Sequence, residues 1–336
     1  VSLEERGESF YNQRIPAVLE ELTAKQVAEE SDGAMCVFPA DAATGEVQRD
    51  KTPLICRKSD GGFNYASTDL TALKQRLEEE AADWLVYVTD VGQKQHFDMV
   101  FQAAQRAGWL TSEEGKDAAA PRVDHVGFGL VMGEDGKRFR TRSGETVRLV
   151  DLLDEAKQRC HAQLLERGRD TELPPDELDA AATALGYGAV KYADLHNNRT
   201  SNYTFSFDRM LDLRGNTAVY LLYAHARICS IVRKSEMDVI KTVENSAINL
   251  ADPKEVQLAM ALARFPEAVE ALLEDLAPNK LCDYMYDLSG KYNEFYAECK
   301  VLGSEEQDSR LALCESTAMV MRQCFHILGI TPLYRI

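Results

Sequence analysis

Three short segments of the sequence combine residue types that could bind a charged small molecule. The first, residues 59–70 (SDGGFNYASTDL), brings two glycines close to an aromatic hydroxyl and a carboxylate, those of Tyr65 and Asp69. A carboxylate holds a planar guanidinium best in bidentate geometry, and an aromatic group beside it adds contact, so this segment could recognise an arginine side chain. The competing interpretation is structural: Asp69 stabilises the positive end of a helix and Tyr65 packs.

The second segment, residues 88–97 (VTDVGQKQHF), lies where a strand is expected to end and a helix to begin. Gln93 and His96 fall on the first turn of that helix. Neutral donors and acceptors there could bind the amino and carboxylate groups of an amino acid, or the ribose of a nucleotide. The alternative interpretation is that Gln93 and His96 are ordinary surface residues at the start of a helix.

The third segment, residues 125–145 (HVGFGLVMGEDGKRFRTRSGE), joins glycines to a basic loop. Glycines such as Gly127 let a flat ring approach the backbone closely, and the cations after residue 136 could neutralise charge on a triphosphate. Lys137, Arg138, Arg140, Arg142 and Arg148 concentrate positive charge within a chain whose net charge is -17. A solvated loop is the alternative interpretation of this segment.

The secondary structure expected around these three segments alternates between strands and helices, and it differs from that of the rest of the chain. Residues 54–56 and 84–89 are apolar strand-like runs, and residues 67–69 supply helix-capping side chains for a helix that continues to Ala81. Alternating strands and helices predict a parallel sheet, in which a strand that is apolar on both faces is covered on both sides. Ligands bind beyond the carboxyl ends of such strands.

From about residue 151 onward, apolar residues recur at steps of three and four, which predicts helices. Residues 258–276 and 311–328 carry such apolar stripes, and we expect both stripes to be buried in a hydrophobic core. Pro266 marks a kink or a fresh helix start, whereas Gly329 and Pro332 are stop signals. Residues 113–120 and 304–309 are expected to be exposed polar loops.

Composition narrows the class of protein. A chain of 336 residues predicts two or three packed units, and no apolar run is long enough to cross a membrane. The eight cysteines form no CxxC pair, so we expect free, buried thiols, a reducing compartment and no tightly bound metal. The first residues lack the pattern of a signal or transit peptide, and we expect the sequence to begin within a longer protein.

Together, the three segments and the helical region resemble the eukaryotic-type cytosolic arginyl-tRNA synthetases, most nearly those of green plants. The resemblance covers nearly the whole chain and lies in residues 5–11, 59–62, 87–93, 140–149, 191–195, 205–208, 215–224 and 328–332. It implies an α/β Rossmann-like catalytic half of class I type, followed by an all-α anticodon-binding bundle of the DALR type. The implied domains are residues 1–150, a helical connecting region at 151–215, and the anticodon-binding domain at 216–336.

The resemblance also implies roles for individual residues. The arginine pocket would comprise Glu8, Tyr65, Asp69 and Gln93. The ATP side would comprise His96, His125, Gly127, Phe128, Phe139, Thr141 and Ser143. The catalytic cations would be Lys137, Arg138, Arg140 and Arg142. They lie in the mobile loop that carries the motif Lys-Met-Ser-Lys-Ser in other class I enzymes. This loop departs from that motif, so which cation meets the pyrophosphate stays open.

The implied reaction is activation of L-arginine by ATP, with Mg²⁺, followed by transfer to the 2′-hydroxyl of the terminal adenosine of tRNA(Arg). Tyr220, Tyr223, Arg227 and Ile336 would contact the tRNA, because exposed aromatics stack on unpaired bases. Core packing is the equal alternative for Tyr220. The implied location is cytoplasmic. Sharing between organelles, and partners in a multi-synthetase or translation complex, are left open.

One motif expected of class I enzymes is missing from this sequence. The first half of the class I fold carries a His-Ile-Gly-His-type motif that holds the triphosphate, and no such motif occurs in this sequence. We therefore expect that this chain alone does not activate arginine. A non-catalytic module that binds tRNA or a protein is the alternative function. A cysteinyl-type synthetase fits less well, because that enzyme uses zinc and the sequence has no zinc-ligand cluster.

Overall fold

The computed structural model describes residues 2–41, 43–111, 119–137, 147–238, 241 and 248–336. The chain divides into two compact units, Val1–Phe128 (unit 1) and Gly129–Ile336 (unit 2). The two units are described separately. The predicted site residues at positions 138–143 lie outside the described part of the chain, as does most of the loop predicted at 113–120.

Unit 1 contains two sheets among its described residues. Strands β1 (Glu29–Ser31), β2 (Ala34–Val37) and β3 (Leu54–Arg57) form an antiparallel sheet. Strands β4 (Trp84–Asp90) and β5 (Arg122–Phe128) pair in parallel over their full length. The strands predicted at 54–56 and 84–89 are confirmed. The expectation that both belong to a parallel sheet is wrong for β3, whose neighbour β2 is reached through a long loop rather than a crossover helix.

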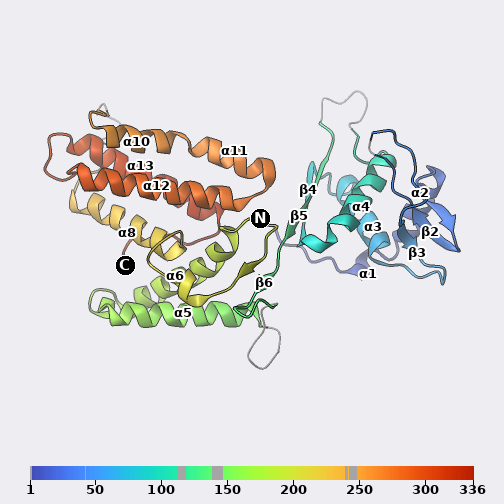
Figure 1. Ribbon diagram of the computed structural model, residues 1–336, viewed down its shortest axis with the longest axis horizontal. Coiled ribbons are helices and arrows are strands. Elements are labelled where there is room, and N and C mark those ends of the chain that lie inside the picture. Colours follow the sequence, from blue (N-terminus) through green and yellow to red (C-terminus); the bar gives the residue numbers. More distant parts are fainter. Residues whose placement is uncertain (1, 42, 112–118, 138–146, 239–240, 242–247) are drawn as a thin grey trace. The chain divides into compact units, whose positions relative to one another are not determined.

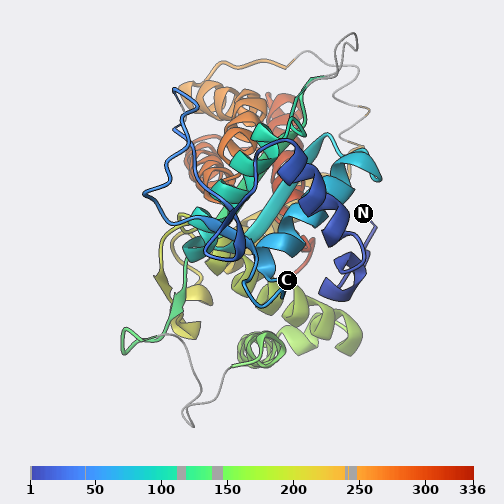
Figure 2. The same ribbon diagram turned by 90° about the vertical axis from the view of Figure 1, so that its right-hand side faces the viewer.

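Helices are the other described elements of unit 1, and the last of them, residues 94–106, contacts the parallel pair at β5. They are α1 (Glu8–Tyr11), α2 (Ile15–Ala24), α3 (Tyr65–Glu78) and α4 (Lys94–Arg106), with a 3-10 turn, η1 (Val91–Gln93), before α4. Within unit 1, α3 packs against both α2 and α4 (Figure 2). Leu85 and Tyr87 of β4 point into this core, but Trp84, Val86 and Val88 are 38%, 43% and 63% exposed. The prediction that β4 is covered on both faces is therefore wrong for this chain.

The start of α3 differs from the prediction in its capping residue. Asn64, not a residue of 67–69, is the N-cap, and its side chain accepts hydrogen bonds from the backbone N–H groups of Ala66 and Ser67. The Ser67 hydroxyl in turn accepts from the Asn64 N–H at 2.9 Å, which completes a capping box. This cap satisfies the first backbone donors of α3 and leaves the side chain of Asp69 for other contacts.

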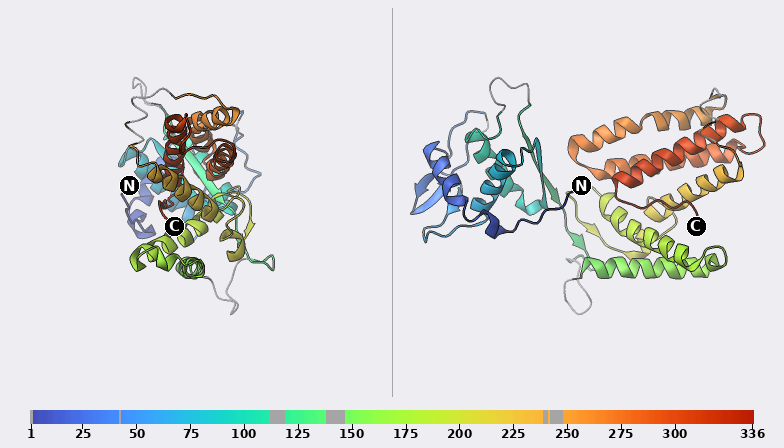
Figure 3. Two further views of the ribbon diagram at one scale, coloured as in Figure 1. Left: turned by 90° about the vertical axis from the view of Figure 1, so that its left-hand side faces the viewer. Right: turned by 180° about the vertical axis from the view of Figure 1, so that it is seen from behind.

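Unit 2 is helical over most of its described residues, as predicted. Its helices are α5 (Leu149–Glu166), η2 (Arg169–Thr171), α6 (Pro175–Leu195), α7 (Phe207–Met210), α8 (Ala218–Lys234), α10 (Pro253–Ala263), α11 (Phe265–Asp275), α12 (Pro278–Glu298) and α13 (Gln307–Ile327). Two short strands, β6 (Val131–Met132) and β7 (Tyr203–Thr204), pair in parallel. Helices α10, α12 and α13 lie side by side (Figures 1 and 3).

Glycine allows α5 and α6 to approach each other closely. A Cβ atom on Gly186 of α6 would lie 2.5 Å from the backbone nitrogen of Lys157 and 2.7 Å from the carbonyl carbon of Ala156. No side chain larger than hydrogen fits there unless the two helices separate. Buried residues of both helices, including Cys160, Leu164 and Ala182, belong to the continuous core of unit 2.

The two predicted helical stripes have different outcomes. Leu311, Cys314, Ala318, Met321, Phe325 and Leu328 are all buried, and Gly329 ends the helix with a positive φ, as expected. In the 258–276 stripe only Leu258 is fully buried, because α11 packs mainly against α12, with a smaller contact to α10, and its remaining surface is partly exposed. Pro266 marks a fresh start at the first turn of α11. Ser309 is buried in α13, so the polar loop predicted at 304–309 ends before that residue.

All eight cysteines are free and buried, as the sequence analysis predicted. No helix among the described residues is long and apolar enough to span a membrane. In the same described ranges, no group of three or more His, Cys, Asp and Glu side chains is arranged to hold a metal ion.

Candidate functional site

The carboxyl ends of β4 and β5 gather several of the predicted site residues within unit 1. Asp90 ends β4, and its carboxylate accepts a hydrogen bond from the Gly92 N–H at 2.7 Å, which shapes the turn into η1 and α4. Gln93 is the exposed residue at the N-terminal end of α4, and His96 lies on the first turn, as predicted. This edge of the sheet is where open α/β folds bind ligands.

Asp69 of α3 and His96 of α4 form the central contact of this strand-end site. The Nε2 atom of His96 lies 2.6 Å from Oδ2 of Asp69, and the two side chains are 25% and 30% exposed. The His96 ring also packs edge-on against the buried Phe97 ring at 5.2 Å. Asp69 therefore has one oxygen engaged by His96, and both residues face a partly solvated space. The contact joins Asp69, which is predicted to bind arginine, to His96, which is predicted to lie near ATP.

Tyr65 and Glu8 lie on elements that contact each other. Tyr65 is the first residue of α3, one turn before Asp69, so both project from the same face of that helix. Its side chain is 74% exposed. Glu8 begins α1, is exposed, and belongs to an element that packs on α3. An exposed aromatic hydroxyl and two carboxylates on adjoining elements can present the partners that a guanidinium requires.

Strand β5 places the predicted ATP-side residues beside η1. The Nε2 atom of His125 lies 2.8 Å from the Thr89 hydroxyl, and its ring stacks on Phe97 with 5.0 Å between centroids. A Cβ on Gly127 would lie 2.9 Å from Cα of Val91, so glycine is required for this close approach. Phe128 is 44% exposed at the end of the strand. Together, these residues form a closely packed surface at the strand end.

The described part of the basic loop belongs to unit 2 and is short. Residues 133–137 form a tight turn in which the Gly133 N–H donates to the Lys137 carbonyl at 2.7 Å. Lys137 is exposed, and its backbone N–H donates to Asp135 at 3.1 Å. The other predicted loop residues, Arg138, Phe139, Arg140, Thr141, Arg142 and Ser143, lie outside the described residues, so the choice of catalytic cation stays a prediction.

Unit 2 carries a basic cavity of about 360 Å³ that includes three of the four residues predicted to bind tRNA. Tyr223, Arg227 and Ile336 line it. Three further arginines also line it, Arg169, Arg233 and Arg335, together with one acidic side chain, that of Glu172. We call this space the basic cavity. It lies between η2, the outer face of α8 and the last residues of the chain.

Hydrogen bonds fix the walls of the basic cavity. The last residues are held against α8, because Arg233 donates to the Tyr334 carbonyl at 2.8 Å and Nδ1 of the buried His225 lies 2.8 Å from the Leu333 carbonyl. Arg167 donates to the Tyr223 hydroxyl at 3.2 Å and lies over its ring. The buried Nε of Arg169 has no hydrogen-bond partner among the described residues, although Nη1 pairs with Glu172 at 2.6 Å.

Tyr220 does not line the basic cavity. Its hydroxyl accepts a hydrogen bond from Asn293 at 2.7 Å and one from Ser289 at 3.4 Å, both on α12. Its ring packs edge-on against Tyr286 at 5.7 Å and against the core of unit 2. This geometry favours the packing interpretation of Tyr220, while its role toward tRNA stays a prediction.

Sequence reasoning missed Arg169, Arg233 and Arg335 as members of the basic cavity. One signal was available, because Tyr223, Arg227, Ser230 and Arg233 recur at helical spacing on one face of α8. No spacing connects that face to Arg169 or Arg335, which approach it only through the packing of unit 2. The pairing of Asp69 with His96 was likewise not visible before the fold was known.

Comparisons with known proteins agree with this arrangement of an α/β unit followed by helices. The model for the catalytic domain of class I tRNA synthetases, type R, matches residues 1–207, and the model for the DALR anticodon binding domain matches residues 221–336. The chain belongs to the arginyl-tRNA synthetase family of class I enzymes. The resemblance and the fold class predicted from the sequence are confirmed. The domain boundaries that we predicted at residues 150 and 215 stay a prediction.

Curated relatives and a solved structure cover the whole chain. The chain is 59% identical to a chloroplastic/mitochondrial arginine–tRNA ligase and 58% identical to a cytoplasmic one, both from Arabidopsis thaliana. Each match covers 100% of this chain but only 51% and 55% of the relative, so the chain spans about half the length of these proteins. The arginyl-tRNA synthetase of Plasmodium falciparum is 33% identical with a TM-score of 0.83, over 100% of this chain and 55% of that one.

Proposed function

We propose that the protein to which this chain belongs is an arginine–tRNA ligase that joins L-arginine to tRNA(Arg) at the expense of ATP. The observation that carries the proposal is the pairing of Asp69 with His96 at 2.6 Å, at the carboxyl ends of β4 and β5 in a chain of this family. The carboxylate of Asp69 has a second oxygen for a guanidinium, and Tyr65 stands one turn away on the same helix face.

In this proposal the residues of unit 1 act by binding and orientation. Glu8, Tyr65 and Asp69 hold the guanidinium, and Gln93 contacts the amino and carboxyl end of the same arginine. His125, Gly127 and Phe128 provide the closely packed surface for the adenine side of ATP, and His96 orients Asp69. The arginine carboxylate then attacks the α-phosphate and pyrophosphate leaves. A tRNA hydroxyl next attacks the carbonyl carbon of the adenylate, and AMP leaves. ATP with Mg²⁺ is a substrate of this reaction, and the cations from Lys137 onward stabilise charge on its phosphates.

The basic cavity of unit 2 is the proposed contact for an unpaired base of tRNA(Arg). Tyr223 offers a ring for stacking, and four arginines offer donors to phosphate or to base edges. This local concentration of cations provides an electrostatic attraction for RNA that the net charge of -17 would not suggest. We propose a cytoplasmic location, with sharing between organelles left open, because a cytoplasmic and a chloroplastic/mitochondrial relative both match the full chain and the eight free thiols fit a reducing compartment.

The test is charging of tRNA(Arg) transcript with labelled arginine by the full-length protein, with lysine and a non-cognate transcript as controls. We expect charging with arginine alone. We also expect the 336-residue chain by itself to give no ATP–pyrophosphate exchange with arginine and tRNA, because the outer face of β4 is bare and the chain spans about half of its relatives. Failure of the full-length protein to charge would favour the alternative, a synthetase-derived binding module.

A further inference from the structure

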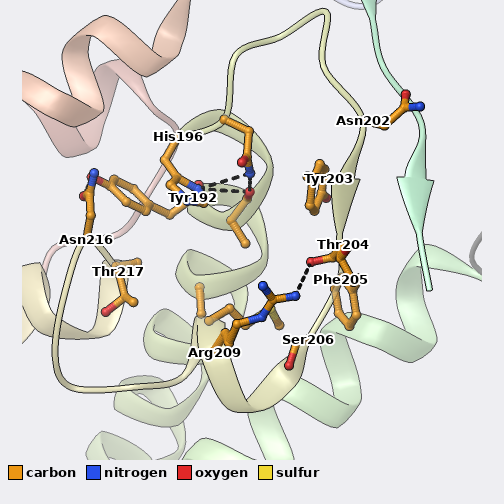
Figure 4. Close-up of a pocket in the computed structure, with 15 residues that line it drawn as sticks. Tyr192, His196, Asn202, Tyr203, Thr204, Phe205, Ser206, Arg209, Asn216 and Thr217 are labelled. Atoms are coloured by element: carbon orange, nitrogen blue, oxygen red, sulfur yellow. Dashed lines mark hydrogen bonds between the residues drawn. The ribbon is translucent and has the colours of Figure 1, made fainter. Parts of the chain in front are cut away.

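A second cavity in unit 2 has no role in the proposed function. It encloses about 320 Å³ between the end of α6, the β7–α7 segment and the start of α8 (Figure 4). We call it the α6–α7 cavity. Its volume lies at the lower end of the range for small-molecule pockets, roughly 300–1,000 Å³. None of its 15 lining residues is an aspartate or a glutamate, in a chain with 55 acidic residues, and it contains the guanidinium of Arg209. This charge pattern favours an anionic ligand.

Two stacked rings form one side of the α6–α7 cavity. The Tyr192 and His196 rings lie 5.7 Å apart and nearly parallel, at 7°. Tyr192 is buried, and its hydroxyl lies 2.5 Å from Oδ1 of Asn216 and 3.1 Å from the Cys282 carbonyl, so it cannot turn toward a ligand without breaking both contacts. The half-buried His196 ring is therefore the accessible end of a fixed stack.

The hydrogen bonds of His196 determine what it can offer. Its Nδ1 lies 3.0 Å and 3.1 Å from the carbonyl oxygens of Tyr192 and Ala193, which can only accept. The two carbonyls lie closer to Nδ1 than the Nδ2 donor of Asn197 does, at 3.5 Å, so we assign the proton of the neutral ring to Nδ1. Nε2 is then an acceptor with no hydrogen-bond partner among the described residues. Next to it, Asn197 donates to the Ala193 carbonyl at 2.6 Å and keeps its own carbonyl oxygen for a ligand.

Arg209 supplies the cation of the α6–α7 cavity. Its Nη2 donates to the Thr204 carbonyl at 3.1 Å, which anchors the guanidinium inside the lined space, and the dashed line in Figure 4 marks this bond. The figure shows Tyr192 and His196 on one side of the space and Tyr203 and Phe205 on the other. The remaining donors of Arg209 have no carboxylate partner among the described residues, so they are available to an anion.

We propose that the α6–α7 cavity binds a single nucleotide, with its base against His196 and its phosphate at Arg209. A fixed ring face, amide and imidazole acceptors, and one anchored guanidinium are the groups that recognise an unpaired nucleotide. The inference rests on the proposed function when the nucleotide is part of tRNA(Arg). A free nucleoside monophosphate has the same chemistry, and the two arms of the experiment distinguish these sources.

The first arm measures binding of tRNA(Arg) transcript to the full-length protein by filter retention over a series of salt concentrations. We expect His196→Ala and Arg209→Gln each to weaken binding by about tenfold, the scale of one lost stacking or phosphate contact. Arg209→Gln should also lower the slope of log affinity against log salt by about one. His196→Phe keeps a ring for stacking and should bind nearly as the wild type does.

Arg214→Gln is the matched control for charge. Arg214 lies on the same connection, its side chain is 90% exposed, and it does not line the α6–α7 cavity. If Arg214→Gln weakens binding as much as Arg209→Gln does, the effect is a general loss of positive surface charge, and the proposed site is refuted. Circular dichroism and the urea midpoint of each variant identify any that fail to fold. If His196→Ala does not fold, Arg209→Gln compared with Arg214→Gln carries the test.

The second arm uses CMP and UMP as probes, because an adenine pocket does not favour them, and detects their binding by saturation-transfer NMR. Signals that are lost in His196→Ala and Arg209→Gln, with unchanged tRNA affinity, would assign the cavity to free nucleotides. Unchanged tRNA affinity together with no such signals overturns the proposal. Charging of tRNA(Arg) by the wild type is measured in the same preparation, so a failure of the proposed function is seen separately from a failure of this site.

Discussion

The strand-end site of unit 1 and the basic cavity of unit 2 differ in how much of their surroundings this chain supplies. In unit 1, Tyr65 is 74% exposed, and one face of β4 is bare at Trp84, Val86 and Val88. In unit 2, the residues of the basic cavity stand on a continuous core, and the last residues are tied down by Arg233 and His225. The comparison teaches that the proposed arginine site is open on one side within this chain, whereas the proposed RNA contact is lined entirely by residues of unit 2.

The largest effect should come from Asp69→Asn, which tests the unit 1 side of the comparison. Loss of a charged partner for the guanidinium should lower the efficiency of arginine activation about 100-fold, since hydrogen bonds to charged groups contribute roughly 1.5–3 kcal/mol. The measurement is ATP–pyrophosphate exchange by the full-length protein as arginine is varied. Asp98→Asn is the control, because Asp98 is exposed on α4 and pairs with Lys94 at 2.7 Å. Equal losses in both variants would contradict the assignment.

The tight core of unit 2 is tested by two glycine substitutions within helices. Gly186→Ala places a Cβ 2.5 Å from the backbone of α5 and should lower the free energy of unfolding by about 1–3 kcal/mol. Gly290→Ala in α12 meets nothing within 4 Å and should raise it by about 0.5–1 kcal/mol. Urea denaturation measures both. Equal effects would show that α5 and α6 are not in close contact.

A smaller effect is expected from Tyr223→Ala and Arg227→Gln in the basic cavity. Each should raise the KM for tRNA(Arg) by about tenfold, because one stacking or phosphate contact is lost, and leave the KM for arginine unchanged. Steady-state charging of the full-length protein separates the two constants. A parallel rise in the KM for arginine would mean that the two sites are not independent, and the comparison above would fail.

The smallest effect concerns the anchor of the last residues. Burial lowers the pKa of His225 below its ordinary value of 6.5, although the hydrogen bond to Leu333 opposes the shift. The neutral ring is therefore favoured in the folded state, so its contribution to stability is complete above the unfolded pKa and is lost as pH falls below it. Urea midpoints at about pH 7.5 and about pH 5.5 should differ more for the wild type than for His225→Asn. Identical pH dependence would contradict this role.

Local features followed from the sequence more readily than the sites did. The strand at 84–89, the start of α4 at Gln93 and the buried stripe of α13 are confirmed, because their periodicity and end signals depend on neighbours in the chain. The bare face of β4 and the antiparallel setting of β3 were not predicted, because an apolar run does not specify which strand lies beside it.

The sites were predictable only in part, for a related reason. Tyr223, Arg227 and Ile336 were assigned together and do line one cavity, whereas Arg169 joins them through the fold alone. The α6–α7 cavity left no sequence signal, because it combines the end of α6 with residues of the β7–α7 segment and the start of α8. Contacts between distant segments arise from packing, and neither composition nor spacing contains them.

Burial of every thiol has a practical consequence for handling this protein. Burial raises the pKa of Cys282, Cys314 and Cys324 to about 12, so almost no thiolate exists near neutral pH. Because the thiolate is the form that attacks oxidants and alkylating reagents, the folded chain should survive storage without reductant and resist electrophilic labels. A cysteine introduced on its surface would then be the single reactive handle for attaching a dye or a spin label.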